Sequence, residues 1–304
     1  MNKKHLLISA ITLFSTINAK TFSFKSISSY FSSDKYENVE QREIPLKNQS
    51  HIIIETINGP IHIQTWQQQK VLLKAAKRSN KEELLSHMSI DTKSNNDTLI
   101  IKTIYDQEPI KGSVAYELLV PAKINVSIKA GSSPIKIEHI KGTVAIRNQN
   151  GNIELNAVQG PIAIEVINKG SIVVDQANST IKAITHQGNI DIHDAKKSIF
   201  ASTDNGKIKT TCKNVPHGST IKLDASRPIT LQLPTGTNAN LQAETEQGRI
   251  LCEHYLTIKP FITQLNPQAW NHFKQNVNGS LGNGGANICL RSVSGNIKIA
   301  QETT

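Results

Sequence analysis

Histidine and acidic side chains are the residues of this chain that could do chemistry, and two of the histidines lie close together. His186 and His193 flank a predicted turn, with Asp191 and Asp194 beside them. Two histidines seven residues apart across a strand turn do not have the spacing of a zinc site. The sequence also contains neither Cys-x-x-Cys nor His-Glu-x-x-His. We therefore predict no metal site and no cofactor.

Acidic residues at outward positions of the predicted strands are the remaining candidates for catalysis. Any solvent-exposed sheet carries such acids, whereas glycoside hydrolysis requires two carboxyl groups at a defined separation, one of them with a raised pKa. The sequence has no Gly-x-Ser-x-Gly motif, and none of the four arginines after Arg78 lies in an acidic cluster. We predict that the protein is not an enzyme, and a polysaccharide lyase or hydrolase is the weaker alternative. The outward acids are Glu138, Glu154, Asp175 and Asp191.

Residues 1–19 have the composition of a secretory signal peptide. Lys3 and Lys4 precede an uncharged apolar run at 6–17, and Ala19 offers a small residue for cleavage. The run is shorter than the ~20 residues that a spanning helix needs, and no later segment is longer. We expect a protein exported to the periplasm or beyond, without a transmembrane segment after the signal is removed.

The net charge is formally +10 at pH 7, and the lysines are scattered at about one per strand. Scattered lysines protect exposed sheet edges from aggregation, and a basic excess draws a protein toward anionic partners. No nucleic-acid-binding motif is present, and we expect no nucleic acid as a partner.

Three cysteines, at Cys212, Cys252 and Cys289, are too few to build a disulfide scaffold. Burial of apolar side chains must therefore stabilise the fold. A bridge between Cys252 and Cys289 stays open, because each lies four residues after a glycine, and isolated core thiols are the alternative.

A turn residue recurs about every nine positions between 133 and 206. Aliphatic residues alternate after each turn, as at Ile153 and Leu155, and this period of two is typical of a half-buried strand. We expect the turn glycines to supply a positive φ. The repeat positions are Ser133, Gly142, Gly151, Gly160, Gly170, Ser179, Gly188, Lys197 and Gly206, and Gly59, Gly248 and Gly295 are further turn glycines.

The segments before successive turns differ, which sets the length of the structural unit. Polar segments with amides precede Gly151 and Gly188, whereas apolar residues stand two places before Gly142 and Gly160. The unit is therefore two strands and about 18 residues. We predict an all-β, two-sheeted β-solenoid in which each coil covers the isoleucines of the next.

The two ends of the array depart from the repeat. A Ser-rich connector at 20–49 precedes a single solenoid domain at 50–300, and residues 301–304 form a tail. A short helix is expected after Asn80, which would cap it together with Glu83 in a capping box.

An irregular, aromatic segment at about 254–285 interrupts the C-terminal repeats. It is either a cap on the last coil or a contact loop, since irregular segments of repeat proteins often bind partners. In a carbohydrate-binding module, its aromatic rings and that of Trp66 would stack on sugars. The candidate contact residues are Trp66, Tyr255, Phe261, Trp270 and Phe273.

The order of four segments within 51–300 resembles the bacterial putative adhesin family, an exported domain of unknown function. These segments are GPIHIQTW with VLLKAAKR shortly after it, YELLVPAKINVSIKAG, QNGNIEL and GSLGNGGANICLRSVSGNIKI. The resemblance implies a β-solenoid and a non-catalytic role in the envelope or at the surface. Some members of that family carry membrane anchors, whereas this sequence has a plain cleavable signal. We expect a non-enzymatic binding or scaffold protein whose partner is a protein or glycan of the envelope or a surface.

Overall fold

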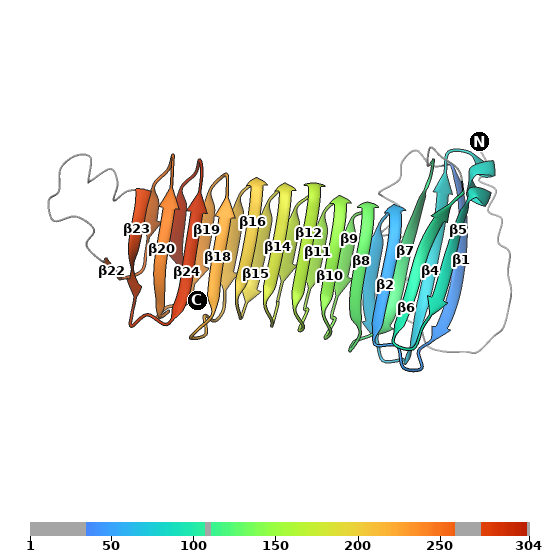
Figure 1. Ribbon diagram of the computed structural model, residues 1–304, viewed down its shortest axis with the longest axis horizontal. Coiled ribbons are helices and arrows are strands. Elements are labelled where there is room, and N and C mark those ends of the chain that lie inside the picture. The colour runs from blue at the N-terminus through green and yellow to red at the C-terminus, as the bar shows by residue number, and fades with distance from the viewer. Residues whose placement is uncertain (1–34, 107–110, 259–274, 303–304) are drawn as a thin grey trace, which may run out of the picture.

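The computed structural model describes residues 35–106, 111–258 and 275–302. The predicted signal peptide lies outside the described residues, as do Phe261, Trp270 and Phe273. Within the described part, two long sheets face each other along an elongated body (Figure 1). This confirms the predicted all-β, two-sheeted solenoid.

Sheet A has twelve strands and sheet B has thirteen. In spatial order, sheet A contains β1 (Tyr36–Pro45), β4 (Lys70–Ser79), β7 (Ser113–Pro121), β3 (Ile61–Trp66), β9 (Ile135–Glu138), β11 (Ile153–Asn156), β13 (Ile172–Asp175), β15 (Ile190–Ala195), β17 (Ile208–Cys212), β19 (Ile229–Leu233), β25 (Ile297–Gln301) and β21 (Ile250–Cys252). In spatial order, sheet B contains β22 (Leu256–Ile258), β23 (Asn276–Leu281), β20 (Ala239–Thr245), β24 (Ala286–Ser292), β18 (Thr220–Ala225), β16 (Ile199–Asn205), β14 (Ile181–Gln187), β12 (Ile162–Lys169), β10 (Val144–Asn150), β8 (Asn125–Ser132), β2 (His51–Asn58), β6 (Thr98–Tyr105) and β5 (Met88–Ser94).

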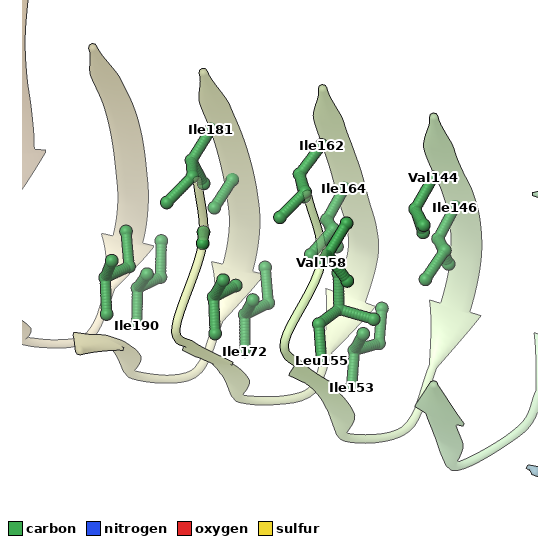
Figure 2. Close-up of a cluster of buried hydrophobic side chains, with 14 of the residues drawn as sticks. Val144, Ile146, Ile153, Leu155, Val158, Ile162, Ile164, Ile172, Ile181 and Ile190 are labelled. Carbon is green, nitrogen blue, oxygen red and sulfur yellow. The ribbon is translucent and has the colours of Figure 1, made fainter. Parts of the chain in front are cut away.

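Each central coil contributes one strand to each sheet, and equivalent residues of successive coils pair in parallel. Ile153, for example, pairs with Ile135 on one side and with Ile172 on the other. Inward residues of the two sheets form one continuous core, part of which Figure 2 shows. Burial of each such isoleucine is worth roughly 1.5–3 kcal/mol relative to exposure. Because neighbouring coils provide that burial, the array is stabilised by stacking.

The turn glycines are required mainly because a neighbouring coil lies too close for a side chain. At all nine predicted turn glycines, a Cβ would come within 1.9–2.6 Å of a backbone atom of another segment. Among them, only Gly59, Gly151 and Gly188 have a positive φ in the left-handed range. The expectation that positive φ explains these glycines is therefore wrong for the other six, where close coil packing is the reason.

Buried polar side chains line the edge where the chain passes from sheet B to sheet A. The Thr185 hydroxyl donates to the Gly170 carbonyl at 2.8 Å, and Thr203 does the same to Gly188. The Asn148 amide donates to the Ser133 carbonyl at 2.7 Å. Each donor lies three residues before a turn glycine, so the polar segments seen in the sequence satisfy carbonyl groups of the preceding coil.

Both ends are built out of sequence order. Strand β24 lies between β18 and β20, and β25 lies between β19 and β21. The chain thus forms the outer strands β20 and β21 first. It then returns, and β24 and β25 are inserted between these strands and β18 and β19. At the other end β6 and β7 lie outside β2 and β3 before the chain returns to β8.

Antiparallel strands close each end of the parallel array. Strand β4 pairs antiparallel with β7, and β1 with β4, at the N-terminal end of sheet A. At the other end β23 pairs antiparallel with β20, and β22 with β23. The described parts of the 254–285 segment therefore extend the sheet edge, which is a way to protect it.

Two predictions at the N-terminal end need correction. Strand β1 lies inside the segment predicted as a connector. Most of its side chains are exposed, so its sequence is polar and lacks the alternation that identifies a strand. The predicted helix is a 3-10 helix, η3 (Glu82–His87), with Lys81 at its N-cap and no side-chain cap hydrogen bond. Asn80 therefore does not cap it. Among the described residues, no helix has the length and apolar character needed to cross a bilayer.

Candidate binding surfaces

The outer face of sheet B carries a row of small side chains beside a row of long ones. Outward residues of neighbouring parallel strands lie side by side because the strands are in register. Ser127, Ala145 and Ala163 form the row of small side chains on β8, β10 and β12. The parallel row contains Lys129, Arg147, Glu165 and Ile184.

This difference in side-chain length produces a shallow depression of about 300 Å³, which we call the sheet B depression. The long row forms one wall, and Lys182 on β14 closes its end. The Arg147 Nε lies 3.5 Å from Glu165, and Lys129 lies 3.9 Å from Glu55. The face therefore presents three cations against one acid within the depression.

Exposed apolar side chains gather on the same face. Ile167, Ile184 and Phe200 are each more than a third exposed and point outward from β12, β14 and β16. Ile57 and Ile104 are outward and exposed further along sheet B. On the outer face of sheet A, large exposed apolar residues occur only on the end strands among the described residues. Apolar groups beside cations are typical of contact surfaces.

The outer face of sheet A holds a hydrogen-bonded acidic cluster near the N-terminal end. Glu138 on β9 accepts hydrogen bonds from Gln64 at 2.7 Å and from His62 at 2.8 Å, and Lys136 lies 3.2 Å away. Burial alone would raise the pKa of Glu138, but these partners outweigh it and lower the pKa to about 2.

A lowered pKa makes Glu138 a source of acid sensitivity. Its stabilising contribution is complete above the ordinary carboxyl pKa of 4.5 and is lost as the pH falls toward about 2. We expect Glu138→Gln to reduce the free energy of unfolding by about 2 kcal/mol at pH 6 and by much less at pH 2.5. Urea unfolding at the two pH values measures this difference. Glu154→Gln, at an exposed position on β11, is the control and should show little change at either pH.

Glu117 on β7 lies on the other side of His62 and behaves in the opposite way. Burial raises its pKa, against the attraction of Lys74, His62 and Arg78. Its side chain is buried, and its Oε2 atom has no hydrogen-bond partner in the part of the chain that the structure describes. Two carboxyl groups with opposite pKa shifts are a pattern of acid–base sites, and here the group with the raised pKa is only 4% exposed.

The histidines and acids that the sequence suggested for a metal do not converge. His186 is on β14 of sheet B and its Nδ1 bonds Asp204 at 2.7 Å, whereas His193 is on β15 of sheet A. Asp194 pairs with Lys213 at 2.7 Å. No group of three or more His, Cys, Asp or Glu side chains in the described part of the chain could hold a metal ion.

The two described aromatic candidates lie at opposite ends of the molecule. Trp66 on β3 is half-buried: its Nε1 donates to the Lys70 carbonyl at 2.8 Å, and the Lys70 ammonium lies 5.8 Å from the ring centre. Tyr255 follows β21 and is 98% exposed. They do not form one stacking platform. The side chains of the sheet B depression were not predicted, although their outward positions follow from the alternation.

The three cysteines are free thiols. Cys252 is on β21 of sheet A and Cys289 is on β24 of sheet B, so the bridge that the sequence left open is not formed. Cys212 lies in the core, and burial raises its pKa to about 12, which makes it unreactive.

Comparison with known proteins matches the model of the family described as Toastrack DUF4097 to residues 42–300. No curated protein sequence matches significantly. One similar solved structure is a "putative adhesin" from Bacteroides fragilis, with 11% identity over 86% of this chain and 97% of that one, at a TM-score of 0.45. Another is a "putative lipid binding protein" from Parabacteroides distasonis, with 13% identity over 88% and 97%, at 0.42. A third is a "putative cell adhesion protein" from Clostridium sporogenes, with 12% identity over 88% and 100%, at 0.28.

Proposed function

This chain belongs to the Toastrack DUF4097 family, and from that premise we propose that it is a non-enzymatic, exported, adhesin-like binding protein. Its partner is an anionic, phosphate-bearing polymer of a cell envelope or surface, which the outer face of sheet B binds. The observation that carries the proposal is the combination of cations and exposed apolar side chains on that face.

The charges of the sheet B depression favour an anionic partner. Lys129 and Arg147 have an acid nearby, whereas no ion pair of Lys182 is found among the described residues. Arginine and lysine both bind phosphate groups, arginine often through two parallel hydrogen bonds. The small side chains of Ser127, Ala145 and Ala163 do not cover these cations. An extended polymer chain that lies across the depression can therefore reach them.

A binding role also agrees with the state of the acidic groups. Glu138 has three partners and a pKa of about 2, so it does not hold a proton for transfer at neutral pH. Glu117 is buried beside His62. Neither carboxyl is placed as a general acid that a polysaccharide could reach.

The test removes the three cations of the depression. In Lys129→Gln/Arg147→Gln/Lys182→Gln, we expect the affinity for immobilised lipopolysaccharide and for wall teichoic acid to fall by about tenfold or more. Surface plasmon resonance with the mature protein measures it. Binding by the parent should also weaken as salt rises from about 50 to about 300 mM, because screening weakens surface electrostatics.

The matched control removes the same net charge elsewhere. Lys197→Gln/Lys207→Gln/Lys209→Gln changes three exposed lysines that lie outside the sheet B face. It should retain the affinity of the parent within about twofold. If both triple variants lose affinity equally, overall charge and not this face is responsible, and the proposal is wrong.

Export remains part of the proposal and has its own test. If residues 1–19 act as a signal, the N-terminus of protein recovered from outside the cytoplasm should be Lys20. Recovery of full-length chain from the cytoplasm alone would contradict it.

A further inference from the structure

The edge where the chain passes from sheet A back to sheet B carries a second surface, separate from the sheet B depression. Two depressions adjoin there and share Lys213. The first, of about 410 Å³, lies over the turns that follow β11, β13 and β15. The second, of about 630 Å³, continues over the turns that follow β17, β19 and β23. We call the two together the edge groove.

Equivalent side chains project into the edge groove from successive coils. Ala157, Gln176 and Asp194 occupy the same turn position and all have φ between +54° and +56°. The residues two places later are Gln159, Asn178 and Lys196. The groove therefore has two columns of side chains, with one step per coil of about 4.8 Å.

Three amide side chains of the first depression have no hydrogen-bond partner among the described residues. Gln159, Gln176 and Asn178 are exposed, and none of their side chains makes a hydrogen bond among the described residues. Elsewhere in the solenoid, the side-chain oxygens of Asn125 and Asn152 accept hydrogen bonds from the backbone of the next coil. The amides of Gln159, Gln176 and Asn178 are thus not needed for stacking and remain available for a ligand.

Two of the three charged side chains in the first depression pair with each other. The Lys213 ammonium lies 2.7 Å from the Asp194 carboxylate, a contact that raises the pKa of Lys213 through its hydrogen bond to Asp194. The lining then consists of amides, which both donate and accept hydrogen bonds, with Lys196 as the remaining cation. Such a set matches hydroxyl groups, which are also donors and acceptors, better than it matches a strongly charged ligand.

We propose that the edge groove binds an extended, neutral polysaccharide along the long axis of the solenoid, with about one sugar unit opposite each coil. The coil step is close to the length of one sugar unit in an extended 1,4-linked chain. Each unit then meets the turn side chains of one coil, which include two amides at Gln176 and Asn178 and one amide at Gln159 in the preceding coil. The second depression continues the site with the hydroxyl group of Thr235 and the amide side chain of Asn283. The Asn238 amide beside them is bonded to the backbone of Gly236 and Asn283.

The site acts independently of the face proposed to bind an anionic polymer. The sheet B depression is lined by residues of β8, β10, β12 and β14, and none of them lines the edge groove. Loss of one binding activity therefore leaves the other to be measured, and failure of one proposal is distinguishable from failure of the other.

The test uses the mature protein with cellohexaose, chitohexaose and hexagalacturonate as probes in isothermal titration calorimetry. We expect at least one neutral hexamer to bind, more tightly than its dimer and more tightly than hexagalacturonate. The variant Gln159→Ala/Asn178→Ala should weaken that binding by about tenfold, because several hydrogen bonds are lost. Both positions are exposed and lie outside the positive-φ residues, so the thermal midpoint should not change.

Gln187→Ala/Asn205→Ala is the matched control, because it removes two exposed amides at the opposite edge. It should bind the hexamer as the parent does. The proposal is overturned if neither neutral hexamer binds, if hexagalacturonate binds better than both, or if the two double variants lose affinity equally.

Discussion

Gly206→Ala is expected to lower the free energy of unfolding by about 3 kcal/mol. A Cβ at this position would lie 1.9 Å from the Gly188 carbonyl oxygen and 2.7 Å from the carbonyl carbon. Both atoms belong to the backbone of the preceding coil, which also pairs with its own neighbours. No side chain can move to make room, so the two coils must separate locally and lose hydrogen bonds and core contacts.

The control for this effect is a glycine whose requirement is only conformational. Gly218 has a φ of +76° and no atom within 4 Å of a Cβ. Gly218→Ala should lower the free energy of unfolding by only about 1 kcal/mol, the penalty for a side chain in the left-handed region. Urea unfolding followed by circular dichroism compares the two. Equal losses in the two variants would mean that coil contact is not the reason for the turn glycines.

Ile172→Ala is expected to have an effect of similar size, about 3–4 kcal/mol. Ile172 is fully buried and stands between Ile153 and Ile190 in the core stack, so the substitution opens a cavity bounded by three coils. The loss should be concentrated in the central coils, because each repeat contacts mainly its neighbours. Hydrogen exchange can locate it, with increased exchange in β11, β13 and β15.

Ile184→Ala is the matched substitution on the outer face. Ile184 is 36% exposed and points away from the core. We expect a change in the free energy of unfolding below about 1 kcal/mol, because mainly strand propensity is altered. A loss at Ile184 as large as that at Ile172 would contradict the assignment of inward and outward faces.

The central coils could be predicted from the sequence because the residues that define each strand and its partners lie close together in the chain. Alternation of period two identifies the inward residues, such as Ile153 and Leu155, and the two kinds of turn identify the coil. Every partner of a central strand lies one coil away in the sequence. Pairing and register therefore follow once the repeat length is known.

The ends could not be predicted, because their strand partners are remote or their sequence signal is weak. The segment with Ile288 and Leu290 has the ordinary repeat pattern, which cannot indicate that it enters between two earlier coils. Strand β1 has few apolar residues, since most of its side chains are exposed.

The candidate surfaces could not be predicted from the sequence for a different reason. The sheet B depression depends on small outward residues such as Ala145 lying beside long ones such as Arg147. The edge groove depends on turn residues, such as Gln176 and Asn178, that alternation does not describe. The sequence favours aromatic residues as contact candidates. Trp66, however, already donates a hydrogen bond to the Lys70 carbonyl, and the Lys70 ammonium lies over its ring. Both surfaces emerge only when the coils are stacked in register.

Disulfide trapping at Cys289 is the measurement that tests in-register coil stacking most directly. Cys289 on β24 is paired with Lys222 of β18 on one side and with Gln242 of β20 on the other. Paired residues on neighbouring strands lie within disulfide range. We predict that Lys222→Cys and Gln242→Cys, in separate variants, each form a disulfide with Cys289 on mild oxidation, as identified by peptide mass spectrometry. Phe200→Cys, one strand further away on β16, should not. Failure of both pairs, or equal trapping at position 200, would contradict the stacking.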